Sequence, residues 1–168
     1  MRWAKLAGGS LLALSFSVLA DSKSASLGVS ATLVNACEAG SNAGGNISFG
    51  ALDFGTAYFL NSAVTVTGQL HAGAIRVKCN SGASYTVLLG GGQSGTAAAR
   101  YLQNTGGQRV SYNLYTSASY SVIWDDQTGQ SQTANGQDQW LAVYGLIPAQ
   151  PTPAVGNYTD TVQVTINW

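Results

Sequence analysis

The sequence predicts an all-β protein built as a β-sandwich, and three observations support this. Short segments of alternating apolar and polar residues recur from Leu27 to the C-terminus, separated by Gly, Asn and Ser about every ten residues. No window shows a sustained helical period with caps. About eight or nine short strands in one chain of this size are typical of a single β-sandwich domain.

The alternating segments define the expected elements in chain order. We expect strands at residues 27–33, 47–54 (in two parts, 47–49 and 52–54), 64–70, 75–79, 85–89, 110–114, 120–124, 140–147 and 162–168. The last strand is the clearest, and we expect it to bury its final aromatic residue; its apolar residues are Val162, Val164, Ile166 and Trp168. Residues 97–101 predict one helical turn. The prolines in residues 148–153 cannot donate to a ladder, so they predict a loop.

The first 20 residues have the pattern of a secretory signal peptide. Arg2 and Lys5 precede a mostly apolar stretch, residues 6–19, which ends in a small-residue cleavage pattern. Gly and Ser interrupt this stretch, and it is shorter than the roughly 20 apolar residues that span a bilayer. We therefore expect secretion with cleavage after Ala20, so that the mature chain begins at Asp21.

The chain carries little charge. Charged residues make up 8% of it, against about 25% in typical domains. Cleavage removes two of the seven basic residues and none of the seven acidic ones, which leaves a net charge near −2. No basic cluster remains to neutralise phosphates, so we expect no nucleic-acid binding. Such a surface favours packing against copies of the same chain or a place in an extracellular layer; compositional drift in secreted β-proteins is the alternative.

The two cysteines are expected to form a disulfide. Cys37 and Cys79 reach an oxidising compartment after export, where a lone pair usually becomes bonded. Closing a loop of this length stabilises a fold by roughly 4 kcal/mol on the chain-entropy estimate.

The titratable residues do not form a recognisable catalytic or metal site. His71 is the single histidine and is interpreted as a solvated turn residue rather than part of a Ser-His-Asp triad. With two bonded cysteines it cannot complete a zinc site. Asp125 and Asp126 are adjacent and predict a polar hairpin turn rather than an acid/base pair. A calcium site that joins them to Asp138 has no spaced Asp/Asn loop to support it.

The Gly-rich and aromatic residues are also given a structural interpretation. Residues 90–95 lack the Lys-Ser/Thr pair and the helix of a phosphate-binding loop. Aromatics on alternating strands more often pack in a core than line a sugar-binding face; those considered are Tyr112, Tyr115, Tyr120, Trp124 and Trp140. We expect no enzymatic activity, no cofactor, no metal and no small-molecule substrate.

Several segments occur together in a characteristic order. They are Val-Asn-Ala-Cys at 34–37, residues 77–90 around the second cysteine, Arg-Tyr-Leu-Gln-Asn at 100–104, residues 110–115, Val-Ile-Trp at 122–124, residues 143–148, and Gly-Asn-Tyr-Thr-Asp-Thr at 156–161 before the terminal strand. From about residue 29 to residue 168 this succession resembles the spore coat U domain family, which includes the subunits of archaic (Csu-type) chaperone–usher pili. Two residues depart from the pattern, Ser117 where many relatives have an acidic residue and Asp125 in place of a Gly. Both lie near predicted turns, so they affect loops rather than fold.

The resemblance implies assembly rather than catalysis. Such pilins are immunoglobulin-like sandwiches that lack their final strand. A periplasmic chaperone lends a strand until the N-terminal segment of an identical or related pilin subunit replaces it at the outer-membrane usher. The expected function is a structural pilus subunit at the cell surface that supports adhesion and biofilm formation. A self-associating coat protein and a secreted carbohydrate-binding module are the alternatives, and an enzyme is far behind.

Within this scheme residues 21–36 are the candidate donor strand and residues 37–168 the pilin domain. An alternating row would enter the neighbour's groove, with main-chain pairing to its sheet; it consists of Leu27, Val29, Ala31 and Leu33. The last strand would face the acceptor groove and the chaperone, through Val162, Val164, Ile166 and Trp168. The alternative is that residues 27–33 form the first strand of a complete sandwich.

Overall fold

A computed structural model describes residues 23–43 and 46–168 of the chain. The described residues fall into two units, residues 23–33 and residues 34–168. None of residues 23–33 belongs to a helix or strand, so the strand predicted at 27–33 is not formed here. The predicted signal peptide, residues 1–20, and its cleavage site lie outside the described residues. No helix in the described ranges is long and apolar enough to cross a membrane.

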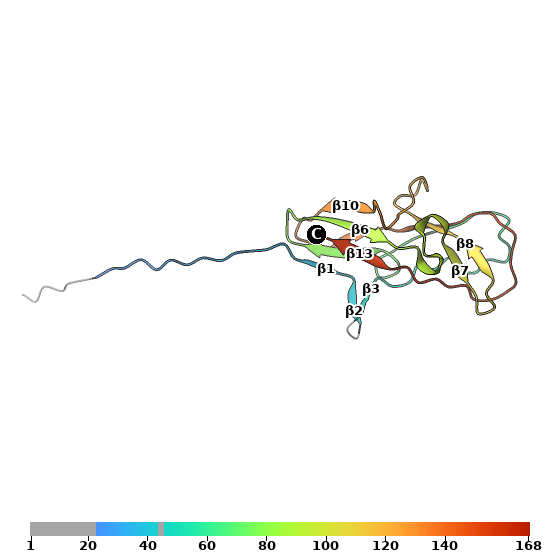
Figure 1. Ribbon diagram of the computed structural model, residues 1–168, viewed down its shortest axis with the longest axis horizontal. Helices are drawn as coiled ribbons and strands as arrows, with labels where there is room; N and C mark the ends of the chain where they lie inside the picture. Colours follow the sequence, from blue (N-terminus) through green and yellow to red (C-terminus); the bar gives the residue numbers. More distant parts are fainter. Residues whose placement is uncertain (1–22, 44–45) are drawn as a thin grey trace, which may run out of the picture. The chain divides into compact units, whose positions relative to one another are not determined.

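The second unit is built from antiparallel strands, which confirms the predicted all-β class (Figure 1). Six of its strands form two three-stranded sheets that continue each other. In sequence order these strands are β1 (Cys37–Ala39), β4 (Val64–Thr67), β5 (Ile75–Cys79), β9 (Asn113–Tyr115), β11 (Gln139–Leu141) and β12 (Tyr144–Ile147). β1 and β11 flank β5, while β4 and β9 flank β12.

A short insertion interrupts the strand formed by β4 and β5. Ile147 pairs with Val64 and Leu141 pairs with Ile75, so β4 and β5 run in the same direction beside β12 and β11. The main-chain N–H of Gly68 donates to the carbonyl of Val143 at 2.7 Å, which keeps the pairing as the chain leaves β4. The sheet therefore has the effective order β1, β4/β5, β11/β12, β9.

The other sheet has the strand order β10, β6, β13. Its strands are β6 (Ser84–Leu89), β10 (Gln130–Thr133) and β13 (Val164–Asn167). Two hairpins accompany the sheets, formed by β2 (Ser41–Ala43) with β3 (Asn46–Ser48) and by β7 (Tyr101–Gln103) with β8 (Arg109–Ser111). Two short 3₁₀ helices, η1 (Gly92–Ser94) and η2 (Ala97–Ala99), connect β6 to β7.

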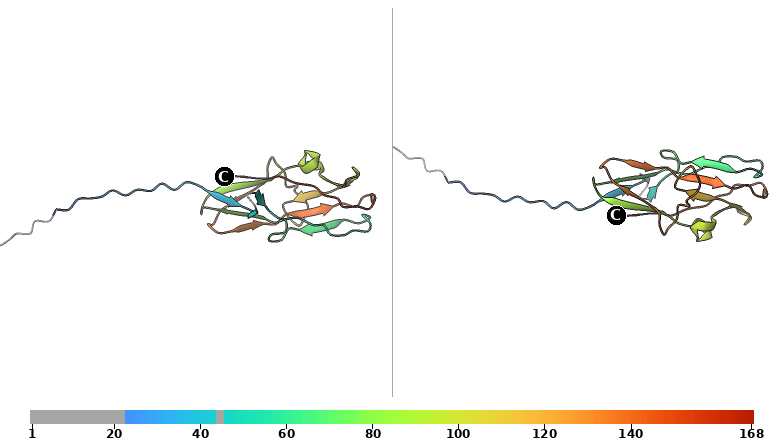
Figure 2. Two further views of the ribbon diagram at one scale, coloured as in Figure 1. Left: turned by 90° about the horizontal axis from the view of Figure 1, so that it is seen from below. Right: turned by 90° about the horizontal axis from the view of Figure 1, so that it is seen from above.

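This topology is that of an immunoglobulin-like sandwich. The first sheet corresponds to strands A, B, E and D of a constant-type domain, and β6 and β13 correspond to strands C and F. The C-terminus lies at the same end of this unit as β1, β6 and β10, and β7 and β8 lie toward the other end (Figures 1 and 2). The position of strand G, beside β13, holds no strand among the described residues.

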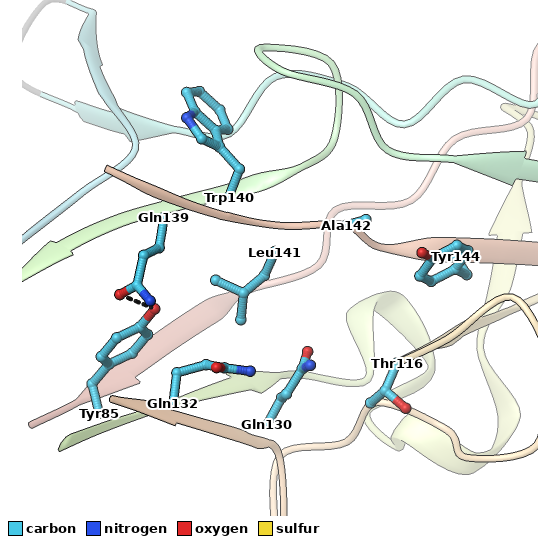
Figure 3. Close-up of a pocket in the computed structure, with 9 residues that line it drawn as sticks. All are labelled: Tyr85, Thr116, Gln130, Gln132, Gln139, Trp140, Leu141, Ala142 and Tyr144. Carbon is cyan, nitrogen blue, oxygen red and sulfur yellow. Dashed lines mark hydrogen bonds between the residues drawn. The ribbon is translucent and has the colours of Figure 1, made fainter. Parts of the chain in front are cut away.

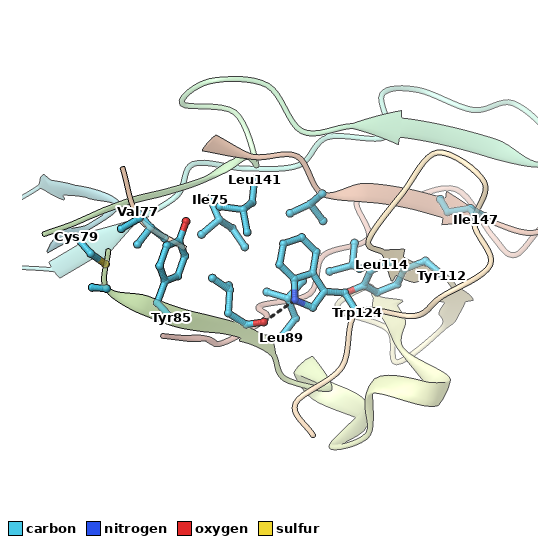
Figure 4. Packing of buried hydrophobic residues seen from close by; sticks show 14 of the residues in the cluster. Ile75, Val77, Cys79, Tyr85, Leu89, Tyr112, Leu114, Trp124, Leu141 and Ile147 are labelled. Carbon is cyan, nitrogen blue, oxygen red and sulfur yellow. Dashed lines mark hydrogen bonds between the residues drawn. The ribbon is translucent and has the colours of Figure 1, made fainter. Parts of the chain in front are cut away.

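The core is built around a tryptophan that comes from a loop (Figure 4). Trp124 is fully buried, and its indole Nε1–H donates to the carbonyl of Val87 at 2.8 Å. The strand predicted at 120–124 is wrong, because this segment makes only a single bridge, between Tyr115 and Ile123. The indole fills the space between the sheets together with Ile75, Val77, Tyr85, Leu89, Leu114 and Leu141.

A buried arginine connects the loops to the sheets. Arg100 is 1% exposed, and its hydrogen-bond acceptors are all uncharged. Nε donates to the carbonyl of Gly90 at 2.9 Å, and Nη1 donates to Asn113 Oδ1 at 2.7 Å. Nη2 donates to the carbonyls of Leu89 and Trp124, both at 2.8 Å. Burial lowers the pKa of Arg100, and these acceptors replace the water that the cation loses.

The other expected elements are confirmed in part. The loop at 148–153 and the helical turn near residue 97, which is η2, are confirmed. Residues 52–54 form no strand, although Leu52 and Phe54 pack against the core. β10 was not expected, because its sequence Gln-Ser-Gln-Thr has no apolar residue. Trp168 is 60% exposed, so the prediction of a buried C-terminal aromatic is wrong.

Candidate functional site

The free edge of β13 carries an incompletely covered apolar row. Ile166 pairs with Val87 and Val164 pairs with Leu89 across the ladder to β6. Val87 and Leu89 are 0% and 2% exposed, whereas Val164 and Ile166 are only half-buried. Their neighbours on the opposite face of β13 are exposed. Since β6 is the only strand that pairs with β13 in the described part of the chain, one side of this row has no β-strand beside it.

The predicted acceptor residues lie largely together. Val162 precedes β13 and continues its half-buried row, so three of the four residues share one face. The main-chain N–H of Gly90 donates to the carbonyl of Gln163 at 2.9 Å and extends the ladder to this point. Trp168 lies beyond the end of β13 and does not share the burial of the other three.

A disulfide fixes β1 at the edge of the other sheet. Cys37 is bonded to Cys79 and lies opposite it in the ladder from β1 to β5, which confirms the predicted disulfide. The pattern of burial repeats that of β13, since Cys37 and Ala39 are half-buried while their partners Cys79 and Val77 are buried. The N–H of Asn80 also donates to the carbonyl of Ala36 at 3.1 Å. The side-chain amide of Asn80 donates to the carbonyl of Val34 at 3.3 Å, so the chain is anchored to the sandwich from residue 34 onward.

The predicted donor residues are exposed to solvent. Leu27 and Val29 are each 88% exposed and Leu33 is 85% exposed, and Ala31 is exposed as well. Gly28, Ser30 and Thr32 separate these apolar side chains. An alternating apolar row of this kind is suited to one buried face of a strand.

The polar groups considered for chemistry have structural partners. His71 lies at an exposed turn with φ of 62°, and its ring meets Trp140 edge-on with centroids 4.9 Å apart. Asp125 Oδ1 accepts the N–H groups of Gln127, Thr128 and Gly129, and the bonds from the last two lower the pKa of this carboxyl. This is the predicted polar turn.

In the part of the chain that the structure describes, the acids, histidines and cysteines are not arranged as a metal centre. Among residues 23–43 and 46–168 there is no group of three or more such residues that could hold a metal ion. In the Gly-rich segment, the N–H of Gln93 already donates to Asp160 Oδ1 at 2.8 Å. A carboxylate of the chain thus occupies the position where a phosphate-binding loop would hold its ligand.

Sequence comparison identifies the family. The Spore Coat Protein U domain matches residues 23–165. The chain belongs to the Spore Coat Protein U domain family. The match includes the predicted donor row at residues 27–33 and β13 up to Thr165.

One solved structure similar to this Spore Coat Protein U domain is a crystal structure from Acinetobacter baumannii. It contains the pre-assembly complex of the chaperone CsuC and the tip adhesion subunit CsuE of archaic chaperone–usher Csu pili. The similarity has a TM-score of 0.50 at 19% sequence identity and covers 82% of this chain and 40% of that chain. At this identity it supports the fold. A comparison with curated proteins found no significant match.

The two departures from the family pattern both lie in turns of the Spore Coat Protein U domain. Ser117 accepts the N–H of Tyr120 through its carbonyl at 3.1 Å, and Asp125 caps the turn described above. Neither residue belongs to a strand. They therefore change loop structure and leave the sheets intact.

The aromatic residues do not form one binding face. Trp124 and Tyr112 are in the core, and the hydroxyl of Tyr112 donates to Asp160 Oδ2 at 2.7 Å. Tyr115 and Tyr120 pack edge-on against each other, and Trp140 contacts His71. A sugar site built on Trp124 is excluded by its burial. Sequence reasoning missed Arg100, because a buried cation held by carbonyl groups leaves no local pattern.

Proposed function

We propose that this chain is a structural subunit of a secreted surface pilus, assembled by donor-strand exchange. The observation that carries the proposal is the half-buried row of Val162, Val164 and Ile166 on a strand with one unpaired edge. A β-strand with an open edge and an uncovered apolar face is prone to pair with another chain. A strand added beside β13 would take the position of the missing strand G and would cover this row.

The donor in this proposal is the N-terminal segment of a neighbouring subunit. Its exposed apolar residues alternate, so one face of an added strand would present all four of them; they are Leu27, Val29, Ala31 and Leu33. Each larger side chain that leaves water contributes about 1.5–3 kcal/mol, and the row contributes roughly 5–10 kcal/mol in gross terms. Ladder hydrogen bonds to β13 add to this. Such a complex dissociates slowly, as a fibre requires.

A short linker, residues 34–36, separates the donor row from the sandwich. Leu33 is the last donor residue, and the disulfide anchors the chain at Cys37. We therefore assign residues 21–36 to the donor segment and residues 37–168 to the pilin domain. Residues 34–36 would redirect the segment toward a neighbour.

The same proposal defines the partners. They are identical or related pilin subunits, a periplasmic chaperone that covers β13 before assembly, and an outer-membrane usher. The similar solved structure is a complex of a chaperone with a pilus subunit, which supports this choice. The subunit would be secreted through the periplasm after signal-peptide cleavage, would contribute to adhesion and biofilm formation, and would act without catalysis or a cofactor.

Fibre formation by a truncated chain tests the proposal. Deletion of residues 21–33 from the mature protein is expected to abolish fibres while binding to the chaperone persists. The matched control replaces Ser24 and Ser26 by Thr. Both are polar residues before the donor row, so this chain should polymerise normally. Fibres from the truncated chain would show that another segment supplies the contact. A stable monomer that never associates would favour a self-contained domain instead.

A further inference from the structure

A second opening in the sandwich lies on the side away from β13 and β1. β10 is an edge strand of its sheet, and β11 has no strand paired on its outer side among the described residues, since β9 pairs with β12 only; a cleft of about 460 Å³ lies between β10 and β11 (Figure 3). The two strands follow each other in the chain, yet each belongs to a different sheet. The intervening turn, residues 134–138, thus joins the two walls of the cleft.

The walls of this cleft are lined by side-chain amides where a sandwich normally has apolar residues. Gln130 and Gln132 are half-buried and alternate with exposed Ser131 and Thr133, so their side chains turn inward from β10. Gln139 faces them from β11 (Figure 3). The amide-lined cleft is defined here by its full lining, which adds Tyr85, Thr116, Trp140, Leu141, Ala142 and Tyr144 to these three glutamines.

One end of the amide-lined cleft is held in place by hydrogen bonds. The hydroxyl of Tyr85 donates to Gln139 Oε1 at 3.1 Å (Figure 3). Gln139 Nε2 donates to the carbonyl of Thr133 at 3.1 Å. Tyr85 itself is 2% exposed, and burial raises the pKa of its hydroxyl, which therefore stays protonated as a donor. These two bonds fix the orientation of the Gln139 amide.

An amide oxygen in the cleft has no partner. Gln130 Oε1 is buried and accepts no hydrogen bond from any described residue. Buried polar atoms are normally paired, so this acceptor calls for a donor from outside the chain. The lining contains no Asp, Glu, Lys, Arg or His. A charged ligand would find no counter-charge there, and an apolar ligand would leave the amides unpaired.

We propose that the amide-lined cleft binds a neutral sugar unit of an extracellular polysaccharide. Each sugar hydroxyl both donates and accepts, which matches the paired N–H and carbonyl of a Gln amide. The volume falls in the usual range of ligand pockets, about 300–1,000 Å³. Side-chain amides, hydroxyls and rings face the cleft, and these groups suit a sugar, which is recognised through side chains; an extended peptide would instead pair with the free main-chain edge of β10 or β11. The site lies away from β13 and does not depend on the proposed assembly.

Saturation-transfer difference NMR on the full chain, in whichever assembly it is isolated, tests this site. The probes are maltose, cellobiose and lactose, and we expect transfer to the ring protons of at least one of them. Gln130→Ala and Gln132→Ala are each expected to weaken binding about tenfold, the change that follows loss of about one neutral hydrogen bond. Gln137→Ala, an exposed glutamine in the adjoining turn, should bind like the wild type. Circular dichroism identifies the variants that keep the β fold. Gln130→Glu, which keeps the size of the side chain, should also lose binding.

Three results would overturn the proposal. The first is absence of transfer to all three disaccharides. The second is binding that a folded Gln130→Ala, Gln132→Ala double variant retains unchanged. The third is binding of a Ser/Thr-rich peptide that none of the disaccharides displaces. If the chain binds a sugar but forms no fibres, only the proposal of donor-strand assembly is contradicted. The two proposals can therefore fail separately.

Discussion

The guanidinium of Arg100 donates a 2.8 Å hydrogen bond to the main-chain carbonyl of Trp124. The same Nη2 donates to the carbonyl of Leu89, so one side chain connects the end of β6 to the loop that carries the core tryptophan. Trp124 in turn donates to Val87. These contacts position a loop residue at the centre of the sandwich without a strand to carry it.

Replacement of Arg100 by Lys is expected to destabilise the fold. An ammonium cannot reach the four acceptors that the guanidinium satisfies, and each buried carbonyl left unpaired costs about 1–3 kcal/mol. We expect a loss of at least about 3 kcal/mol in urea unfolding. Arg109→Lys is the matched control, because Arg109 is exposed and lies over the ring of Tyr101. Equal stability of the two variants would contradict the role assigned to Arg100.

Trp124 and Trp168 should respond differently to the same substitution. Trp124→Phe removes buried volume and the bond to Val87, and we expect a loss of about 2–4 kcal/mol. Trp168→Phe should leave the unfolding free energy nearly unchanged, because Trp168 is 60% exposed. Urea unfolding followed by circular dichroism measures both. A large effect at Trp168 would show that its side chain is buried in solution.

The disulfide between Cys37 and Cys79 should contribute a large share of the stability. It closes a loop with a sequence separation of 42 residues, for which chain entropy predicts roughly 4 kcal/mol. The double variant Cys37→Ala, Cys79→Ala should therefore unfold at lower urea concentration, and a reducing agent should destabilise the wild type but leave this variant unaffected. A reductant effect of equal size on both proteins would be inconsistent with this origin.

Stability should fall in strongly alkaline solution. Burial, followed by the hydrogen bond to Asp160, raises the pKa of Tyr112 in the folded state above its ordinary value near 10. Folding therefore favours the protonated hydroxyl, and its stabilising effect is complete below about pH 10 and is lost as the pH rises further. Tyr112→Phe should reduce this slope in unfolding experiments between about pH 9 and 12. Burial also raises the pKa of Tyr85, so a weaker slope should remain.

Much of the fold was predictable because most strands carry an apolar alternation, as in β5, β6 and β13. β10 escaped prediction because its inward residues are Gln130 and Gln132, and amides give no hydrophobic period. The segment at 120–124 alternates like a strand, but Trp124 enters the core from a loop held by Arg100. Local pattern does not encode such long-range hydrogen bonds. The disulfide was predictable from cysteine number and export alone.

The candidate site was predictable in part for a similar reason. The alternating rows at residues 27–33 and 162–168 identify faces that strands bury, but alternation does not say how completely a neighbour covers them. The contrast between buried Val87 and half-buried Ile166 is visible only in the structure. Trp168 continues the sequence pattern yet lies past the end of β13, so its predicted burial is wrong.

Charge on the inner face of β13 should block assembly. Ile166→Asp places a carboxylate in the row that a donated strand would cover, where desolvation is unfavourable. We expect no fibres by electron microscopy from cells that make this variant. Thr165→Asp is the matched control on the exposed face of the same strand and should still assemble. Fibres from Ile166→Asp would indicate that this row is not the contact.

Cross-linking between two differently substituted subunits tests donor-strand exchange most directly. One chain carries Ile166→Cys, and the other carries a single cysteine at residue 27, 29, 31 or 33; the native disulfide is kept in both. When the two chains assemble together, we expect a new intermolecular disulfide for at least one of these positions. Cysteines at residues 28, 30 and 32 should form few cross-links, because their side chains would face away from residue 166. Absence of any cross-link between chains in assembled fibres at all four inward positions would contradict donation of this segment to β13.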